Sequence, residues 1–199
     1  MADDTGPLGQ MATLLRVKAE AAEVTARALL GTLQPRLSHV IAVARLARYV
    51  AVRLEVDPEV LVSAAWLHDV GYAPHVAATG FHPLDGARFL RQAGVPASVI
   101  NLVAHHSFAV VEAELRGLRT ALENEFPYDP SLPHDVLCYC DMTTGPAGKR
   151  VTVDERLSEI RARYGPNDVV TQFIARAETD IVETVGRIEK RVAEASQSK

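Results

Sequence analysis

Apolar residues recur at steps of three and four along the C-terminal part of the chain, and this repeat constrains the fold more than any other feature. The residues of this stripe are Val170, Ile174, Ala177, Ile181, Val185, Ile188 and Val192. Such spacing puts them on one face of a helix, so it predicts one long amphipathic helix that begins after Gly165-Pro166-Asn167. No segment shows the strand-like alternation of apolar and polar residues between turn residues. We therefore predict an all-α protein.

Prolines and glycines divide the rest of the chain into shorter helices. Proline fits the first turn of a helix, where an N–H would be unpaired, and glycine commonly follows the last turn. On these signals we expect helices over residues 8–30, 36–54, 57–69, 82–94, 95–106, 133–141 and 152–164, with loops at 72–82, 123–132 and 142–152. The C-terminal stripe is wide enough to pack on the other helices, and a dimer seam is the alternative.

The composition is that of an ordinary soluble globular protein, with 48% hydrophobic and 23% charged residues. A net charge of −4 argues against binding a nucleic-acid polymer through a basic surface, although a local basic pocket is compatible with it. The acidic N-terminus is unlike a secretory signal, and no apolar run reaches the ~20 residues of a membrane span. We expect a cytoplasmic protein, monomeric or homodimeric, without membrane association. Cys138 and Cys140, spaced C-x-C, are expected to be reduced core residues.

Histidines and aspartates stand at the ends of several predicted helices. His39 lies on the helix over 36–54, His68-Asp69 ends the next one, and Asp141 ends an otherwise apolar helix. Any one of these histidines, taken alone, is more simply a surface or core residue. Together, two imidazoles and two carboxylates form a ligand set that suits Mn, Fe, Co, Zn or Mg. A buried carboxylate at Asp141 would need a partner, and a cation is the strongest one available.

The order His39, His68-Asp69, Asp141 resembles the signature of the HD superfamily of metal-dependent phosphohydrolases. The resemblance covers about 35–142 and implies a helical bundle of five or more core helices. It also implies three regions, namely an N-terminal helical extension (1–34), an HD metal-binding core (35–150) and C-terminal helices that pack on the core (151–199). His39, His68, Asp69 and Asp141 would hold a first divalent metal ion.

Further histidines resemble those of superfamily members that hold two metal ions. By this resemblance Asp69 would bridge to a second metal, with His82, His105 and His106 as its other ligands. Two features depart from better-known members. Ser107-Phe108-Ala109 follows the paired histidines, which disfavours the cyclic-di-GMP phosphodiesterases, and Tyr72 stands where many members carry a phosphate-binding lysine.

Residues near these ligands are candidates for substrate contact and proton transfer. Thr143, Thr144, Lys149 and Arg150 follow Asp141 and could hold a phosphate, although a solvated loop with a basic tip explains them equally well. Tyr72 is a further candidate for substrate binding. His106 or His75 could assist proton transfer, while Asp69 would orient the attacking water.

The sequence therefore predicts a metal-dependent hydrolase of a phosphate ester or anhydride, acting on a nucleotide or another small phosphorylated molecule. Divalent cations supply hydroxide near neutral pH and neutralise phosphoryl oxygens. The same ligands would also serve a mixed-valent di-iron oxygenase of the HD type. A non-catalytic module that binds a nucleotide and signals through the C-terminal helix is a third interpretation.

Overall fold

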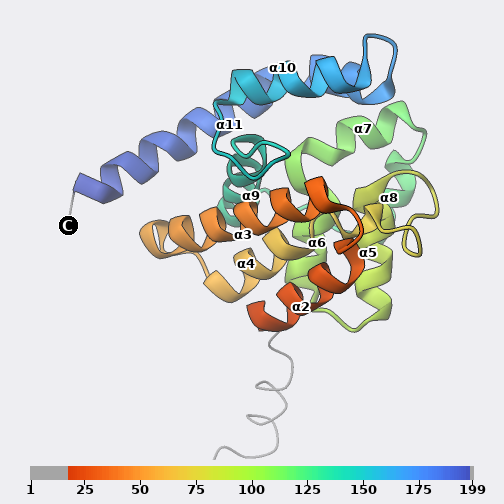
Figure 1. The fold of residues 1–199 in the computed structure, drawn as a ribbon, viewed down its shortest axis with the longest axis horizontal. Helices are drawn as coiled ribbons and strands as arrows, with labels where there is room; N and C mark the ends of the chain where they lie inside the picture. Colours follow the sequence, from red (N-terminus) through yellow and green to blue (C-terminus); the bar gives the residue numbers. More distant parts are fainter. Residues whose placement is uncertain (1–17, 198–199) are drawn as a thin grey trace, which may run out of the picture.

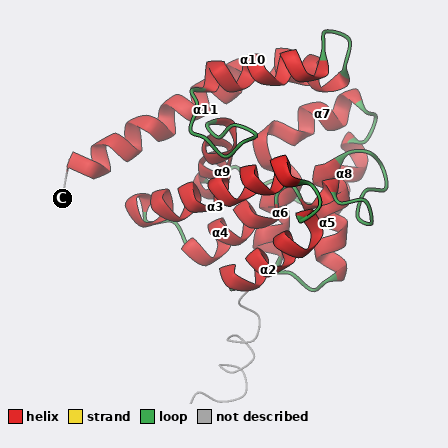
Figure 2. Ribbon diagram, in the orientation of Figure 1, coloured by secondary structure: helices red, strands yellow, loops and turns green. Residues whose placement is uncertain are grey.

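The computed structural model describes residues 18–197, and this part of the chain contains helices and no strand (Figure 2). The all-α prediction is confirmed. The α-helices are α2 (Ala19–Leu30), α3 (Gln34–Leu54), α4 (Pro58–Leu67), α5 (His82–Gln92), α6 (Ala97–His105), α7 (Ala109–Leu115), α8 (Arg119–Glu125), α9 (Leu132–Met142), α10 (Val153–Tyr164) and α11 (Val169–Gln197). Two short 3₁₀ turns, η1 (Val70–Tyr72) and η2 (His106–Phe108), follow α4 and α6.

Helix α4 lies at the centre of the bundle, in contact with α2, α3, α6 and α9 (Figure 1). Its sequence is apolar on every side, and the whole stretch from Leu61 to Leu67 is buried. A helix without a polar face is stable only when other helices surround it. Its start is fixed by Asp57, whose carboxylate accepts hydrogen bonds from the N–H groups of Glu59 (2.9 Å) and Val60 (3.4 Å). Because α4 ends at Leu67, the His68-Asp69 pair that follows it lies in the protein interior.

Two glycines allow η1 and α5 to approach each other closely. A Cβ added to Gly71 would lie 2.0 Å from the carbonyl oxygen of His82, and one added to Gly86 would lie 3.2 Å from the backbone nitrogen of Gly71. A side chain at Gly71 therefore could not fit without moving one backbone away from the other. This contact brings the segment after Asp69 against the start of α5, where His82 is located.

The C-terminal helices pack on the other helices. A capping box starts α10, in which Thr152 and Glu155 each accept a hydrogen bond from the backbone N–H of the other. The apolar stripe of α11 is buried from Phe173 to Ile188, and α11 contacts α3, α7, α9 and α10. Its last turns extend past the other helices (Figure 1).

The structure differs from the expected helices in one region. Helices α7 and α8 were not predicted, and the loop expected over 123–132 begins inside α8. Each has only seven residues, too few for a clear apolar repeat. Of the helix expected over 8–30, residues 8–17 lie outside the described residues.

Two other predictions concern the cysteines and membrane-spanning helices. Cys138 and Cys140 are free and buried in α9, as expected. Among residues 18–197, no helix combines the length and apolar character needed to cross a lipid bilayer.

Candidate metal centre

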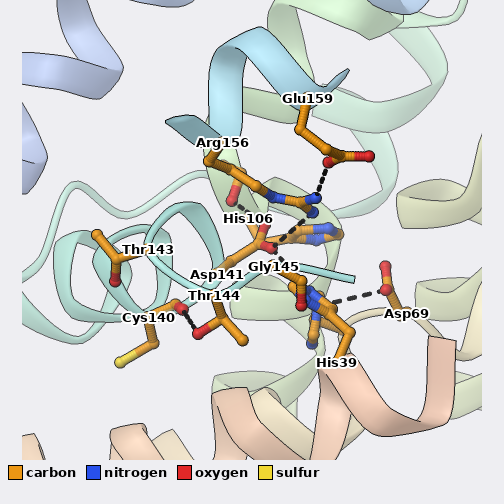
Figure 3. Close-up of polar contacts among 12 residues, drawn as sticks. His39, Asp69, His106, Cys140, Asp141, Thr143, Thr144, Gly145, Arg156 and Glu159 are labelled. Atoms are coloured by element: carbon orange, nitrogen blue, oxygen red, sulfur yellow. Dashed lines mark hydrogen bonds and ion pairs between the residues drawn. The ribbon is translucent and has the colours of Figure 1, made fainter. Parts of the chain in front are cut away.

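His39, His68 and Asp141 come from three elements and meet inside the bundle. His39 is on α3, His68 follows α4, and Asp141 is in the last turn of α9. One potential ligand atom of each lies within 4.8 Å of the others, and all three residues are buried. His39 Nε2 is 3.0 Å from Asp141 Oδ1 (Figure 3). The structure thus brings together three ligands predicted for the first metal ion.

Asp69, His82 and His106 form a second cluster beside the first. His82 Nε2 lies 3.4 Å from Asp69 Oδ1 and 3.1 Å from His106 Nε2. The other carboxylate oxygen of Asp69 lies 3.5 Å from His68 Nε2, which belongs to the first cluster. Asp69 therefore lies between the two clusters, where a bridging ligand would have to lie.

The proton positions on these imidazoles suit a cation. The Nδ1 atoms of His39, His68 and His106 face the backbone carbonyls of Gly145 (3.3 Å), Ala65 (2.8 Å) and Val103 (2.7 Å). A carbonyl only accepts, so each Nδ1 carries the proton and each Nε2 of a neutral imidazole is a lone pair. These Nε2 atoms point at carboxylate oxygens or at one another.

Lone pairs at such distances repel unless a second proton or a cation lies between them. His68 Nε2 is fully buried and finds no hydrogen-bond partner within residues 18–197. A buried orphan acceptor of this kind is costly, and a metal ion would satisfy it. The residues therefore fit two divalent cations, one held by His39, His68 and Asp141 and the other by Asp69, His82 and His106.

The electrostatic surroundings favour the ionised form of both aspartates and the neutral form of His82 and His106. Burial opposes ionisation of Asp69, but the charge of the Arg36 guanidinium beside it favours the carboxylate, and the pKa of Asp69 is well below the usual value. Burial also opposes ionisation of Asp141, and its contacts with His39 and Arg156 bring its pKa below the usual value. For His82 and His106, burial lowers the pKa. Ionised carboxylates and neutral imidazoles are the forms that ligate metals.

Three residues that the sequence did not suggest as part of the site contact the ligands. Arg36 Nη1 donates to Asp69 Oδ2 at 2.8 Å, and Ser107 Oγ donates to Asp141 Oδ2 at 2.5 Å. Arg156 of α10 lies 4.0 Å from Asp141 Oδ1, between this carboxylate and Glu159 (Figure 3). Arg36 could have been found, because it precedes His39 by three residues and shares its helix face. Ser107 and Arg156 depend on tertiary contacts.

The four residues after Asp141 that were expected to contact substrate have other surroundings. Thr143 and Thr144 are buried, and their hydroxyls donate to the carbonyls of Tyr139 (2.5 Å) and Cys140 (2.7 Å) in α9. Arg150 donates to Thr143 and to the Tyr139 hydroxyl, and Lys149 is exposed. None of these four residues lines the cavity that adjoins the two clusters.

His105 and His75 also lie apart from the clusters. The Nε2–H of His105 donates to the carbonyl of Phe126 at 2.7 Å, and its ring lies beside Tyr128. His105 ends α6 whereas His106 starts η2, so the two neighbouring side chains point in different directions. His105 is therefore left out of the ligand set that we propose. His75 is exposed and outside this cavity.

Tyr72, by contrast, borders the second cluster. Its ring stacks on His82 with 4.1 Å between ring centroids, and the Arg36 guanidinium lies 3.7 Å above its centroid. Arg36 thus provides a positive charge near the position where many HD proteins carry a lysine.

A cavity of about 70 Å³ adjoins both clusters. Asp69, His82, His106 and Asp141 line one side, and α10 and α11 line the other with Arg156, Arg163, Tyr164 and Phe173. Glu112 also lines it, and burial raises the pKa of this carboxyl group. The C-terminal helices therefore form a wall of the candidate site.

The comparisons with known proteins agree with this geometry. The HD domain family model matches residues 36–142, which are 107 of the 199 residues, and the chain belongs to this family. It is similar to ribonuclease Y of Acidothermus cellulolyticus, with 35% identity over 103 residues that make up 48% of this chain and 20% of that protein. It is also similar to ribonuclease Y of Opitutus terrae, with 37% identity over 83 residues, 41% of this chain and 16% of that protein. The matches thus span a fifth or less of these relatives. No solved structure matches the chain significantly.

Proposed function

We propose that the protein is a metal-dependent hydrolase that cleaves a phosphate ester or anhydride of a small phosphorylated molecule, such as a nucleotide. The observation that carries the proposal is the pair of adjacent clusters, in which imidazole nitrogens of four histidines converge on the carboxylates of Asp69 and Asp141. Bound divalent cations would make hydroxide available at neutral pH and neutralise the phosphoryl group.

The chain's own residues would orient the reactants. Arg36 contacts Asp69 and has further N–H groups that can bind a phosphoryl oxygen. Ser107 fixes one oxygen of Asp141, which leaves the other oxygen directed toward His39. Glu112 retains its proton to higher pH than an ordinary glutamate, so it could protonate a leaving group.

The size of the site supports a small substrate. The cavity at the clusters holds about 70 Å³, and a neighbouring cavity of about 300 Å³ shares Arg36, Tyr72, Arg156 and Arg163 with it. Together they approach the volume that small-molecule sites need. RNA is a second candidate substrate, because the relatives reported above are ribonucleases by name.

Hydrolysis by the metal-loaded protein, measured as product formation by chromatography, tests the proposal. Metal-free protein is supplied separately with Mn²⁺, Fe²⁺, Co²⁺, Zn²⁺ or Mg²⁺ and offered phosphomonoesters, dinucleoside polyphosphates, cyclic nucleotides and short RNA. We expect turnover with at least one metal, and a loss of at least about a hundredfold in Asp141→Asn, since even residues behind a metal ligand contribute 10–100-fold. Asp135→Asn is the matched control, because Asp135 lies on the same helix in a surface ion pair with Arg187.

Three results would contradict the proposal. These are the absence of turnover with every metal, activity that persists in Asp141→Asn, and oxygen uptake by iron-loaded protein without hydrolysis of any of these compounds. The last result would favour the di-iron oxygenase.

A further inference from the structure

A second cavity adjoins the one at the clusters and carries an unusual set of charged residues. It holds about 300 Å³ and lies between the start of α3 and α10. Three arginines line it, Arg36 from α3 and Arg156 and Arg163 from α10. Among the described residues that line it, there is no carboxylate. Its remaining lining is largely apolar or aromatic, with Leu33, Pro35, Pro146 and Tyr72.

Arg156 of this cavity has a buried nitrogen without a hydrogen-bond partner. It is 5% exposed, and its Nε finds no hydrogen-bond partner within the described part of the chain. A buried donor of this kind is costly unless a ligand or water satisfies it. Its Nη1 donates to Glu159 at 2.6 Å, and the same carboxylate also lies 3.3 Å from Nε of Arg163. One glutamate therefore serves two guanidinium groups, and the other carboxylate near Arg156, that of Asp141, is 4.0 Å away.

The position of the cavity links it to the metal clusters. His39, a ligand in the first cluster, lines it, and Arg36 connects it to Asp69 of the second. A molecule whose reacting phosphate sits at the clusters could therefore place a second group in this cavity. Guanidinium groups bind phosphate through paired, charge-assisted hydrogen bonds. The apolar walls and the ring of Tyr72 suit the carbon skeleton or base between two phosphates.

We infer that this arginine-lined cavity is a subsite for a second phosphate, and that the substrate is a nucleotide-sized molecule with two separate phosphate groups. This inference rests on the proposed function, because the first phosphate would occupy the metal clusters. Arg156 and Arg163 lie outside residues 36–142, so the subsite is formed partly by helix α10, which the HD domain match does not include. Helix α10 would then determine which phosphorylated molecule is accepted.

The test compares two probes that differ by one phosphate, adenosine 3′,5′-bisphosphate and adenosine 5′-monophosphate. Binding of each probe to the full chain is measured by calorimetry, with and without Mn²⁺. We expect the bisphosphate to bind about tenfold tighter or more, since one charge-assisted hydrogen bond accounts for roughly that factor. In Arg163→Gln this preference should fall by about tenfold. Arg161→Gln should keep it, because Arg161 is on the same helix but pairs with Glu178 of α11.

The results distinguish this inference from the proposed function. Equal affinity for the two probes in the wild-type protein, or an unchanged preference in Arg163→Gln, would overturn the subsite. A preference that disappears in Arg163→Gln but persists in Arg161→Gln supports it, even if neither compound is hydrolysed. Hydrolysis of both compounds without any preference would leave the enzyme proposal standing and contradict the subsite alone.

Discussion

Ser107 illustrates how a single residue orients Asp141, one of the proposed metal ligands. Its backbone has φ 49° and ψ 42°, and that of Phe108 has φ 61°, so two consecutive non-glycine residues adopt the left-handed conformation. This conformation costs about 1 kcal/mol or more for each residue, and it persists where surrounding contacts stabilise it. Here the sharp turn between α6 and α7 directs the Ser107 hydroxyl at Asp141.

Replacing Ser107 by alanine tests this role. Asp141 would lose a buried donor that fixes its orientation, so we expect Ser107→Ala to weaken metal binding by about tenfold or more while the fold persists. Competition of Mn²⁺ or Zn²⁺ with a chelating dye measures the affinity. Ser63→Ala is the control, because the buried Ser63 hydroxyl has no hydrogen-bond partner in the described chain. If both variants bind metal as the wild type does, Ser107 has no part in holding Asp141.

At the scale of secondary-structure elements, the contact between η1 and α5 determines whether the second cluster can form. Asp69 immediately precedes η1, and His82 opens α5. Their side chains meet only because Gly71 lets the two backbones touch. Asp85 further stabilises the connecting loop, since its carboxylate accepts hydrogen bonds from the N–H groups of Ala78 and Thr79, each at 2.9 Å.

We therefore expect Gly71→Ala to destabilise the protein and to weaken metal binding. The new methyl group would collide with backbone that cannot move alone, and overpacking of this kind costs about 1–3 kcal/mol or more. Gly186→Ala is the opposite case, because a Cβ there meets nothing within 4 Å on helix α11. It should stabilise the protein by about 0.5–1 kcal/mol, since alanine restricts the unfolded chain. Urea unfolding with a chelator present measures the stability of both variants. If Gly71→Ala and Gly186→Ala changed the stability equally, the close contact at Gly71 would be contradicted.

The length of a helix decided whether the sequence could predict it. Long helices with apolar repeats and proline or glycine boundaries, such as α3 and α11, were located within a few residues. The short helices α7 and α8 were missed because seven residues hold too little periodicity. Residues of the site that lie on predicted helix ends, such as His68 and Asp141, could be proposed from sequence. Arg156 could not, because it reaches Asp141 only after α10 has packed over the clusters.

At the scale of the whole molecule, the protein buries an unusual number of histidines. Burial lowers the pKa of His82, His105, His106 and His134, which places four depressed imidazoles in one bundle. His105 and His134 lie outside the metal clusters and contact each other, since His134 Nε2 donates to the carbonyl of His105 at 2.7 Å. An imidazole that is neutral when folded but protonated when unfolded makes stability depend on pH.

The metal-free protein should therefore lose stability as the pH falls below about 6.5, the usual histidine pKa. Below this value the unfolded chain takes up protons that the folded chain resists, so the free energy of unfolding decreases with falling pH, by about 1.4 kcal/mol per pH unit for each such imidazole. The decrease continues until the folded state itself becomes protonated. The ionised Asp69 and Asp141 act in the same direction at lower pH, because their pKa values are also depressed. Glu112, whose pKa is raised, acts in the opposite direction.

Urea unfolding at pH 7.5, 6.5 and 5.5 measures this dependence. His134→Gln removes one buried imidazole outside the clusters, so its stability should fall less steeply between pH 6.5 and 5.5 than that of the wild type. His75→Gln is the matched control, because His75 is exposed and its replacement should leave the slope unchanged. Added Zn²⁺ should raise stability most at pH 7.5, since its ligands bind in the deprotonated form. A wild-type stability that does not change across this range would mean that the folded chain takes up as many protons as the unfolded chain, so the buried imidazoles would not be held in the neutral form that binds metal.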